Sequence, residues 1–127
     1  LSALKAVKKV SGSIKIIGVT TLTSLNNNDL KLIGYNKNVN NLVIHQTKLA
    51  RKASLDAIVC SPYEVSAVRK IFNREIITPG IQIGKKNYDQ KRSMEAQNVK
   101  SDWLVIGRAI TRGNIKKNIK NLEKELS

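Results

Sequence analysis

The chain has 127 residues, with 23 Lys and Arg against 9 Asp and Glu, and a formal net charge of +14. Its one cysteine, Cys60, excludes an internal disulfide and a cysteine metal cluster, and we expect no bound metal. No stretch approaches the roughly 18 apolar residues of a membrane span, and no signal-peptide pattern is present, so we expect a soluble, cytoplasmic protein without a membrane partner.

The positive charge raises nucleic acid as a possible partner. The basic residues are scattered, however, and no long run of them marks a nucleic-acid-binding tail. The three tyrosines are also too dispersed for a base-stacking platform. A basic nucleic-acid-binding protein is therefore the less favoured interpretation of the charge.

The first half of the chain alternates helix and strand patterns. Apolar residues recur every three positions over residues 4–10 and at i, i+3, i+4 spacing over residues 39–53, which predicts two helices. Between them, residues 14–19 form a short β-branched run that predicts a strand, and residues 56–60 form a second. Ser61 is an N-cap followed by Pro62, and Glu64 completes a capping box, so a further helix should begin there.

The second half continues the alternation. Residues 75–78 predict a third strand that stops at Pro79-Gly80, and the loop over 79–90 is long for a strand-to-helix connection. Residues 93–95 are expected to start a short helix. Residues 103–106 predict a fourth strand, with Trp103 packed in a core or barrel wall, and an apolar stripe over 115–126 predicts a terminal helix.

The four runs are short and continuously apolar, which predicts buried parallel strands joined by right-handed crossovers. Such a chain is α/β, either a small open sheet or half of a (β/α)₈ barrel, because a complete barrel needs about 250 residues. We expect residues 1–127 to form a single domain. If it is half a barrel, the strands at 14–19 and 103–106 have exposed edges that invite association.

Ligands of such folds bind at the carboxyl ends of the strands. The fourth strand ends at Gly107 and Arg108, where a glycine lets backbone N–H groups approach an anion and a guanidinium adds a forked donor. A phosphate site is one interpretation of this pair. The other is that Gly107 only makes a turn and Arg108 is a solvated charge.

Five segments resemble motifs of the bacterial orotidine 5′-phosphate decarboxylases, in the family's order and near its spacing. They are GVTTLTS at 18–24, LDAIVCSPYE at 55–64, TPGI at 78–81, DQKRSM at 89–94 and LVIGRAIT at 104–111. The resemblance implies a partial (β/α)₈ TIM barrel made of strands five to eight. It also implies a lyase of de novo pyrimidine biosynthesis, usually a homodimer, that converts orotidine 5′-phosphate to UMP and CO₂ without a cofactor.

The resemblance also implies roles for single residues. Thr23 and Ser24 would face the pyrimidine and ribose, Gln90 would close over the substrate, and Gly107 and Arg108 would bind the 5′-phosphate. Gln82 stands where the family has a phosphate-binding arginine. An amide can still donate a hydrogen bond, and Lys85 or Lys86 in the same loop could supply the missing charge.

The family's catalytic Asp-x-Lys-x-x-Asp is not found in this sequence. The nearest match, residues 29–34, lacks the second Asp and is expected to be an ordinary surface helix. No catalytic residue is therefore assigned, and the chain is expected to be a fragment that supplies the phosphate- and pyrimidine-binding half. A separate N-terminal half or a homodimer would complete it. The alternative is a non-catalytic, nucleotide-phosphate-binding remnant of a split gene.

Overall fold

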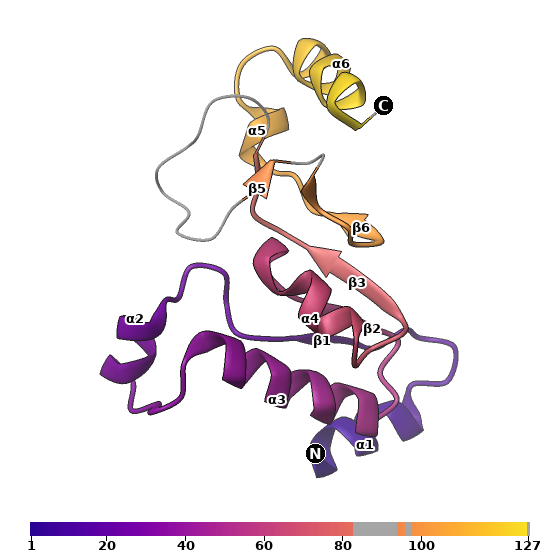
Figure 1. Cartoon of the computed structure of the whole chain (residues 1–127). Coiled ribbons are helices and arrows are strands. Elements are labelled where there is room, and N and C mark those ends of the chain that lie inside the picture. The colour runs from indigo at the N-terminus through magenta and orange to yellow at the C-terminus, as the bar shows by residue number, and fades with distance from the viewer. Residues whose placement is uncertain (83–93, 96–97, 127) are drawn as a thin grey trace.

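The computed structural model describes residues 1–82, 94–95 and 98–126. Its elements alternate between helices and short strands along the chain (Figure 1). In chain order they are α1 (Ser2–Val10), β1 (Ile17–Val19), α2 (Asn27–Leu32), α3 (Val39–Lys52), β2 (Ala57–Val59), the 3₁₀ helix η1 (Pro62–Glu64), α4 (Val65–Arg69), β3 (Glu75–Thr78), β4 (Ile81–Gln82), β5 (Met94–Glu95), β6 (Trp103–Leu104), α5 (Arg108–Thr111) and α6 (Ile115–Leu126).

Four of the strands form one parallel sheet in the order β1-β2-β3-β6. The four predicted strands are thereby confirmed as parallel neighbours, although their bounds are shorter than expected. Among the described strands, β1 and β6 are the two edges, as predicted, and the sheet is not closed. The architecture is therefore an open α/β sheet with the strand order expected of consecutive βα units.

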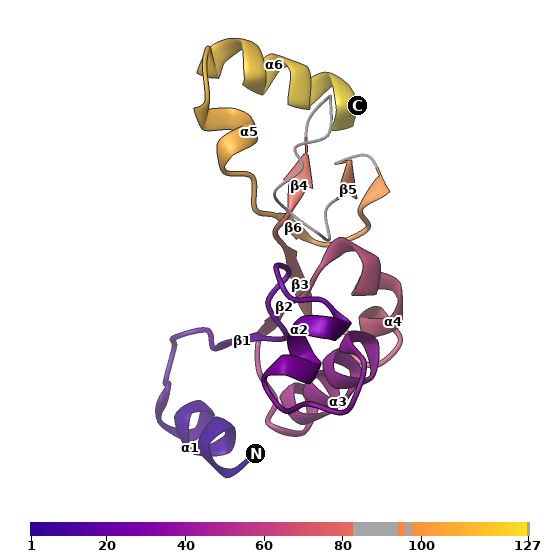
Figure 2. The same cartoon turned by 90° about the vertical axis from the view of Figure 1, so that its left-hand side faces the viewer.

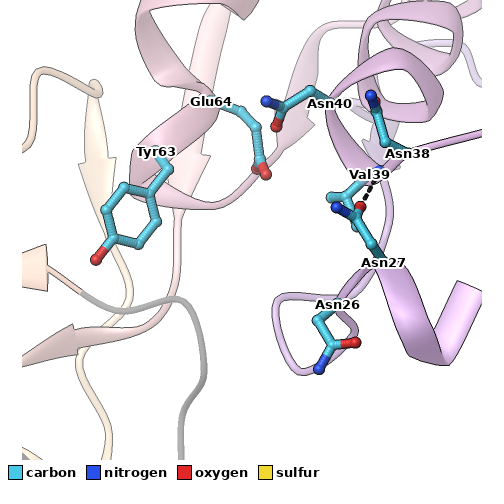
Figure 3. A pocket seen from close by; sticks show the side chains of 7 residues that line it. All are labelled: Asn26, Asn27, Asn38, Val39, Asn40, Tyr63 and Glu64. Carbon is cyan, nitrogen blue, oxygen red and sulfur yellow. Dashed lines mark hydrogen bonds between the residues drawn. The ribbon is translucent and has the colours of Figure 1, made fainter.

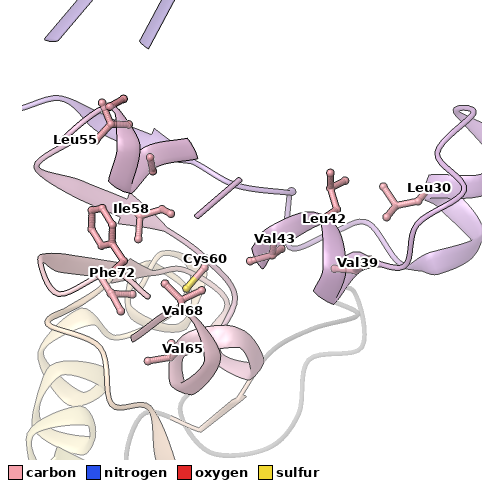
Figure 4. Packing of buried hydrophobic residues seen from close by; sticks show 13 residues of the cluster. Leu30, Val39, Leu42, Val43, Leu55, Ile58, Cys60, Val65, Val68 and Phe72 are labelled. Carbon is pink, nitrogen blue, oxygen red and sulfur yellow. The ribbon is translucent and has the colours of Figure 1, made fainter. Parts of the chain in front are cut away.

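Helices cover one face of this sheet. Figure 2 shows α2, α3 and α4 on the same side of β1, β2 and β3. Ile58 and Ile76 point to that side and are 1% and 0% exposed, and Phe72, three residues after α4, is also buried. Figure 4 shows the resulting core, in which Val43 and Val68 pack with these residues. We call this the helix-covered face.

The opposite face is formed by the alternate residues of the same strands. The strand register places Val19, Val59, Ile77 and Trp103 in one row across the sheet, and Ile17 lies two residues before Val19. We call these five residues the open face. Val19 is 64% exposed and Trp103 is 58% exposed. The prediction of buried strands was therefore wrong for β1 and β6, and Trp103 lies outside the core.

Gly18 leaves space for the side chain of Leu55, which lies between α3 and β2. A Cβ built on Gly18 would lie 2.8 Å from Cδ1 of Leu55 and 3.9 Å from Cβ of Ala50. Both neighbours are buried, so there is little space into which Leu55 could move. The glycine in the middle of β1 is thus explained by packing of the helix-covered face.

Two aspartates, Asp56 and Asp102, form equivalent hydrogen bonds at the amino ends of neighbouring strands. Asp56 precedes β2, and its carboxylate accepts the Ile16 N–H at 2.7 Å and the Lys8 ammonium at 2.6 Å. Asp102 precedes β6, and its carboxylate accepts the Ile76 N–H at 2.7 Å together with the Arg69 guanidinium. In each case the Asp N–H also donates to the carbonyl of the same isoleucine. These paired bonds fix the register of neighbouring strands.

Most of the predicted helices are present. The Ser61 capping box is confirmed, with the Ser61 N–H donating to Glu64 at 2.9 Å, and residues 27–32 form the expected short helix α2. The short helix expected from residue 93 is wrong at Met94–Glu95, which instead pair as β5 with β4 in a separate two-stranded parallel sheet. Backbone pairing with Ile81–Gln82 thus overrides the local helix pattern there.

Candidate functional site

Every predicted site residue that the structure describes lies at the carboxyl end of a strand. Thr23 and Ser24 follow β1, Gln82 ends β4 just beyond β3, and Gly107 and Arg108 follow β6. Gln90, Lys85 and Lys86 lie outside the described residues. The described candidates therefore share one end of the sheet, where parallel α/β folds bind ligands.

The open sheet does not bring all of them together. Thr23 and Ser24 follow one edge strand, whereas Gly107 and Arg108 follow the other edge strand, with β2 and β3 between them. Three strand spacings of about 4.8 Å separate the two edges by about 14 Å within the sheet. The candidates therefore form two groups at the same end of the sheet, one beyond each edge strand.

The turn after β6 is accessible. Gly107 precedes α5 and is exposed, and a Cβ built on it would meet nothing within 4 Å. Its carbonyl accepts the N–H groups of Ile110 and Thr111, which closes the turn of α5. Arg108 is the first residue of α5 and is also exposed. The backbone at Gly107 is therefore open to an approaching anion, because the glycine has no side chain and the space beside it is empty.

The loop after β1 is anchored by α3. Thr20 and Thr21 are buried, and Gln46 of α3 accepts both the Thr21 N–H at 2.9 Å and its hydroxyl at 3.1 Å. The Thr20 hydroxyl donates to the Val59 carbonyl at 2.7 Å. These contacts set the direction in which the chain leaves β1 toward Thr23. Gln46 was not among the predicted site residues, although a glutamine on an otherwise apolar helix stripe is a usable signal.

A cavity of about 240 Å³ lies near these loops, between α2, the start of α3 and η1 (Figure 3). Its polar lining is engaged in helix capping: Asn27 Oδ1 accepts the Val39 N–H at 2.9 Å, and Asn38 Oδ1 accepts the Asn41 N–H at 2.8 Å. Glu64 accepts the Ser61 N–H. These groups stabilise helix ends, so we do not assign a ligand to this cavity.

The described part of the chain offers few side chains for metal binding. It contains no group of three or more His, Cys, Asp and Glu residues suited to a metal ion. Cys60 is buried in the core and His45 is exposed on α3. None of the described helices has the length and apolar character needed to cross a membrane.

The sequence matches one family model over residues 1–120, described as "Orotidine 5'-phosphate decarboxylase / HUMPS family". Orotidine 5′-phosphate decarboxylase of Wolbachia sp. subsp. Brugia malayi (strain TRS) is 44% identical over 117 residues, covering 88% of this chain and 51% of the relative. The enzyme of Coxiella burnetii (strain RSA 331) is 45% identical over 102 residues, covering 76% and 43%.

The fold agrees with this match. The crystal structure of orotidine 5′-phosphate decarboxylase from Lactobacillus acidophilus superposes with a TM-score of 0.76 at 22% identity, covering 98% of this chain and 58% of that chain. The four-stranded sheet is accordingly part of a (β/α)₈ barrel, as predicted. The chain spans about half the length of the curated relatives it matches. From the match over residues 1–120, the chain belongs to the orotidine 5′-phosphate decarboxylase family.

Proposed function

We propose that the chain supplies the phosphate- and pyrimidine-binding half of an orotidine 5′-phosphate decarboxylase. The reaction breaks the bond between the pyrimidine ring and its carboxylate, releases CO₂ and leaves a ring carbanion that takes up a proton to give UMP. The observation that carries the proposal is the position of the family motifs, because segments 18–24, 78–81 and 104–111 all lie at the carboxyl ends of parallel strands of one sheet.

The two groups of candidate residues bind different parts of the substrate. Gly107 and Arg108 bind the 5′-phosphate, and Thr23 and Ser24 contact the pyrimidine and ribose. A nucleotide extended between phosphate and base suits two groups on opposite edges of the sheet. Gln82 and Gln90 complete the binding site from the connection between β3 and β6, with Lys85 or Lys86 supplying the charge that Gln82 lacks.

Phosphate binding far from the reacting carbon contributes to catalysis as well as to affinity. Binding energy from an unreactive group can be used to close a loop over the substrate and orient it. A charge-assisted hydrogen bond from Arg108 contributes about 1.5–3 kcal/mol. The chain contributes no proton donor under this proposal, because the family's Asp-x-Lys-x-x-Asp has no counterpart in the sequence. Residues outside the given sequence must supply the proton donor.

The test measures UMP binding to the chain from the changes in NMR chemical shifts. Arg108→Ala should weaken binding by about tenfold to a hundredfold, the equivalent of one charge-assisted hydrogen bond. Arg112→Ala removes the same charge four residues later, just past the end of α5, and should change binding little. Equal losses from both variants, or none from Arg108→Ala, would contradict the assignment of the phosphate.

A second experiment addresses the connection after β3. Gln82→Arg restores the family's charge and should tighten UMP binding, whereas Lys85→Ala/Lys86→Ala should weaken it. If the double variant binds UMP as tightly as the unchanged chain, the two lysines do not replace the arginine.

A non-catalytic nucleotide-binding protein is the second candidate function, and it is favoured by Gln82, which stands where the family has a phosphate-binding arginine. The two functions differ in one measurement. UMP binding without turnover of orotidine 5′-phosphate, in the presence of the other half of a barrel, would support the non-catalytic protein.

A further inference from the structure

A groove runs along the second half of α3 and reaches the segment that follows α4. Its volume is about 470 Å³, and it is lined by His45, Lys48, Leu49, Arg51, Lys52 and Ile71. We call it the α3 groove. α3 and α4 pack against each other in the middle of the chain (Figure 1), so two neighbouring helical segments form its walls.

The α3 groove lies toward the amino ends of the strands. α3 ends at Lys52, shortly before β2 begins at Ala57, and the segment after α4 leads in the same way to β3. A helix between two parallel strands returns the chain to the end of the sheet at which the next strand starts. The groove is therefore at the opposite end of the sheet from the candidate functional site and shares no residue with it.

The cations of the α3 groove differ from the other cations at this end of the sheet. Three other basic side chains lie against the carboxylates of Asp56 and Asp102, which are bonded to neighbouring strands. Lys48, Arg51 and Lys52 form no salt bridge with any carboxylate that the structure describes. Their charge is thus available to a binding partner.

The sequence around the groove carries charge of one sign. No Asp or Glu occurs between Asp29 and Asp56, a stretch that includes the whole of α3. Lys48 and Lys52 are four residues apart on one helix, which places them about 6 Å apart along its axis, and Arg51 is exposed beside them. Charges of one sign along a groove attract a ligand of the opposite sign.

Leu49 and Ile71 give the groove an apolar part. Each is half-buried, and they come from different helical segments. No Phe, Tyr or Trp is among the described residues that line the groove, so it has no platform on which nucleic-acid bases would stack. Apolar side chains next to unpaired cations instead suit a helix that carries leucines and carboxylates on one face.

We propose that the α3 groove binds an acidic amphipathic helix of another protein. The carboxylates of that helix pair with Lys48, Arg51 and Lys52, and its apolar side chains pack on Leu49 and Ile71. The complementary charge steers the two proteins together, and the apolar contact gives the complex its register. This binding is independent of the proposed function, because the groove is at the other end of the sheet from the proposed nucleotide-binding residues.

The probe is a fluorescently labelled synthetic peptide of 14 residues, the length of α3. It carries Leu at i, i+3, i+4 and i+7 positions and Glu at the flanking positions, so that both kinds of side chain share one helical face. Fluorescence anisotropy should show saturable, one-to-one binding to the chain. Raising the ionic strength from about 0.05 M to about 0.5 M should weaken binding by about tenfold or more, because salt screens the charges.

Matched double variants locate the contact. Lys48→Gln/Lys52→Gln should weaken peptide binding by about tenfold or more. Lys116→Gln/Lys120→Gln removes the same two charges, with the same spacing, from the exposed surface of α6 and should change binding by less than about twofold. Neither pair belongs to the residues proposed to bind UMP.

Two competitor molecules identify the class of partner. A peptide of the same composition, scrambled so that Leu no longer lies on one helical face, should bind about tenfold more weakly or less. A single-stranded DNA oligonucleotide of equal negative charge should not displace the amphipathic peptide at an equal concentration, because the groove has no stacking platform.

Four outcomes would overturn the inference. They are the absence of peptide binding, equal losses from the two double variants, equal binding of the scrambled peptide, and displacement by the oligonucleotide, which would indicate a nucleic-acid-binding surface. UMP binding is measured separately on the same proteins. If the unchanged chain binds the peptide but not UMP, the proposed function fails and the inference about the α3 groove stands.

Discussion

The two faces of the β1-β2-β3-β6 sheet are built from the same short strands and similar apolar residue types, yet only one of them is packed. On the helix-covered face, Ile58 and Ile76 are almost completely buried. On the open face, Val19 and Trp103 are more than half exposed, although both belong to the same strands or their neighbours. The comparison shows that the burial of a strand residue depends on which elements pack against its face of the sheet. The residue pattern along the strand does not reveal those elements.

The largest expected effect comes from deleting volume on the helix-covered face. Phe72→Ala should destabilise the chain by about 3–5 kcal/mol, because it removes a buried aromatic ring and leaves a cavity in the core. Urea denaturation followed by circular dichroism measures the change. A loss below about 1 kcal/mol would mean that the core formed with α3 and α4 is not the main source of stability.

A smaller effect is expected from adding volume on the same face. Gly18→Val should cost about 1–3 kcal/mol, because its Cβ would meet the buried Leu55 side chain at 2.8 Å. Gly107→Ala is the matched control, since its Cβ would meet nothing within 4 Å. Thermal melts of the two variants should separate clearly, and equal melting temperatures would argue against close packing at β1.

Acid should weaken the hydrogen bonds that Asp56 and Asp102 accept at the amino ends of the strands. The Lys8 hydrogen bond, with help from the Ile16 N–H and against partial desolvation, holds the pKa of Asp56 below its ordinary value of 3.8. For Asp102, desolvation raises the pKa, but hydrogen bonds from Arg69 and the Ile76 N–H outweigh it, so this pKa is lowered too.

A carboxylate with a lowered folded-state pKa stabilises the fold fully above its unfolded pKa and loses that contribution as pH falls through the folded pKa. We therefore expect stability to be insensitive to Asp56 and Asp102 above about pH 5 and to decline below about pH 4. Urea midpoints measured against pH should show this decline. The double variant Asp56→Asn/Asp102→Asn should lose less stability than the unchanged chain as the pH falls below about 4. An equal loss in both would show that other groups control the stability in acid.

The smallest effect is expected on the open face. Val19→Thr should change the stability of the isolated chain by less than about 0.5 kcal/mol, because the side chain is 64% exposed and loses few contacts. Urea midpoints of the variant and the unchanged chain measure the difference, and a large loss would mean that the face is already covered.

Much of the fold could be predicted from local pattern. Short apolar runs predict the strands and their parallel order, because the pattern is set by neighbouring residues. The Ser61–Glu64 capping box predicts the start of η1 for the same reason. The positions of Thr23, Ser24, Gly107 and Arg108 at strand ends were predictable for the same reason. The anchoring of their loop by Gln46 was not, because it joins residues 25 positions apart.

By itself the sequence determined the kind of fold, the family motifs and the end of the sheet on which the candidate residues lie. Only the tertiary structure decided which face of the sheet stays open and that Met94–Glu95 pair as a strand. The physical reason is that secondary structure responds to periodicity and capping within a few residues. Burial and convergence depend on elements that are distant in the chain.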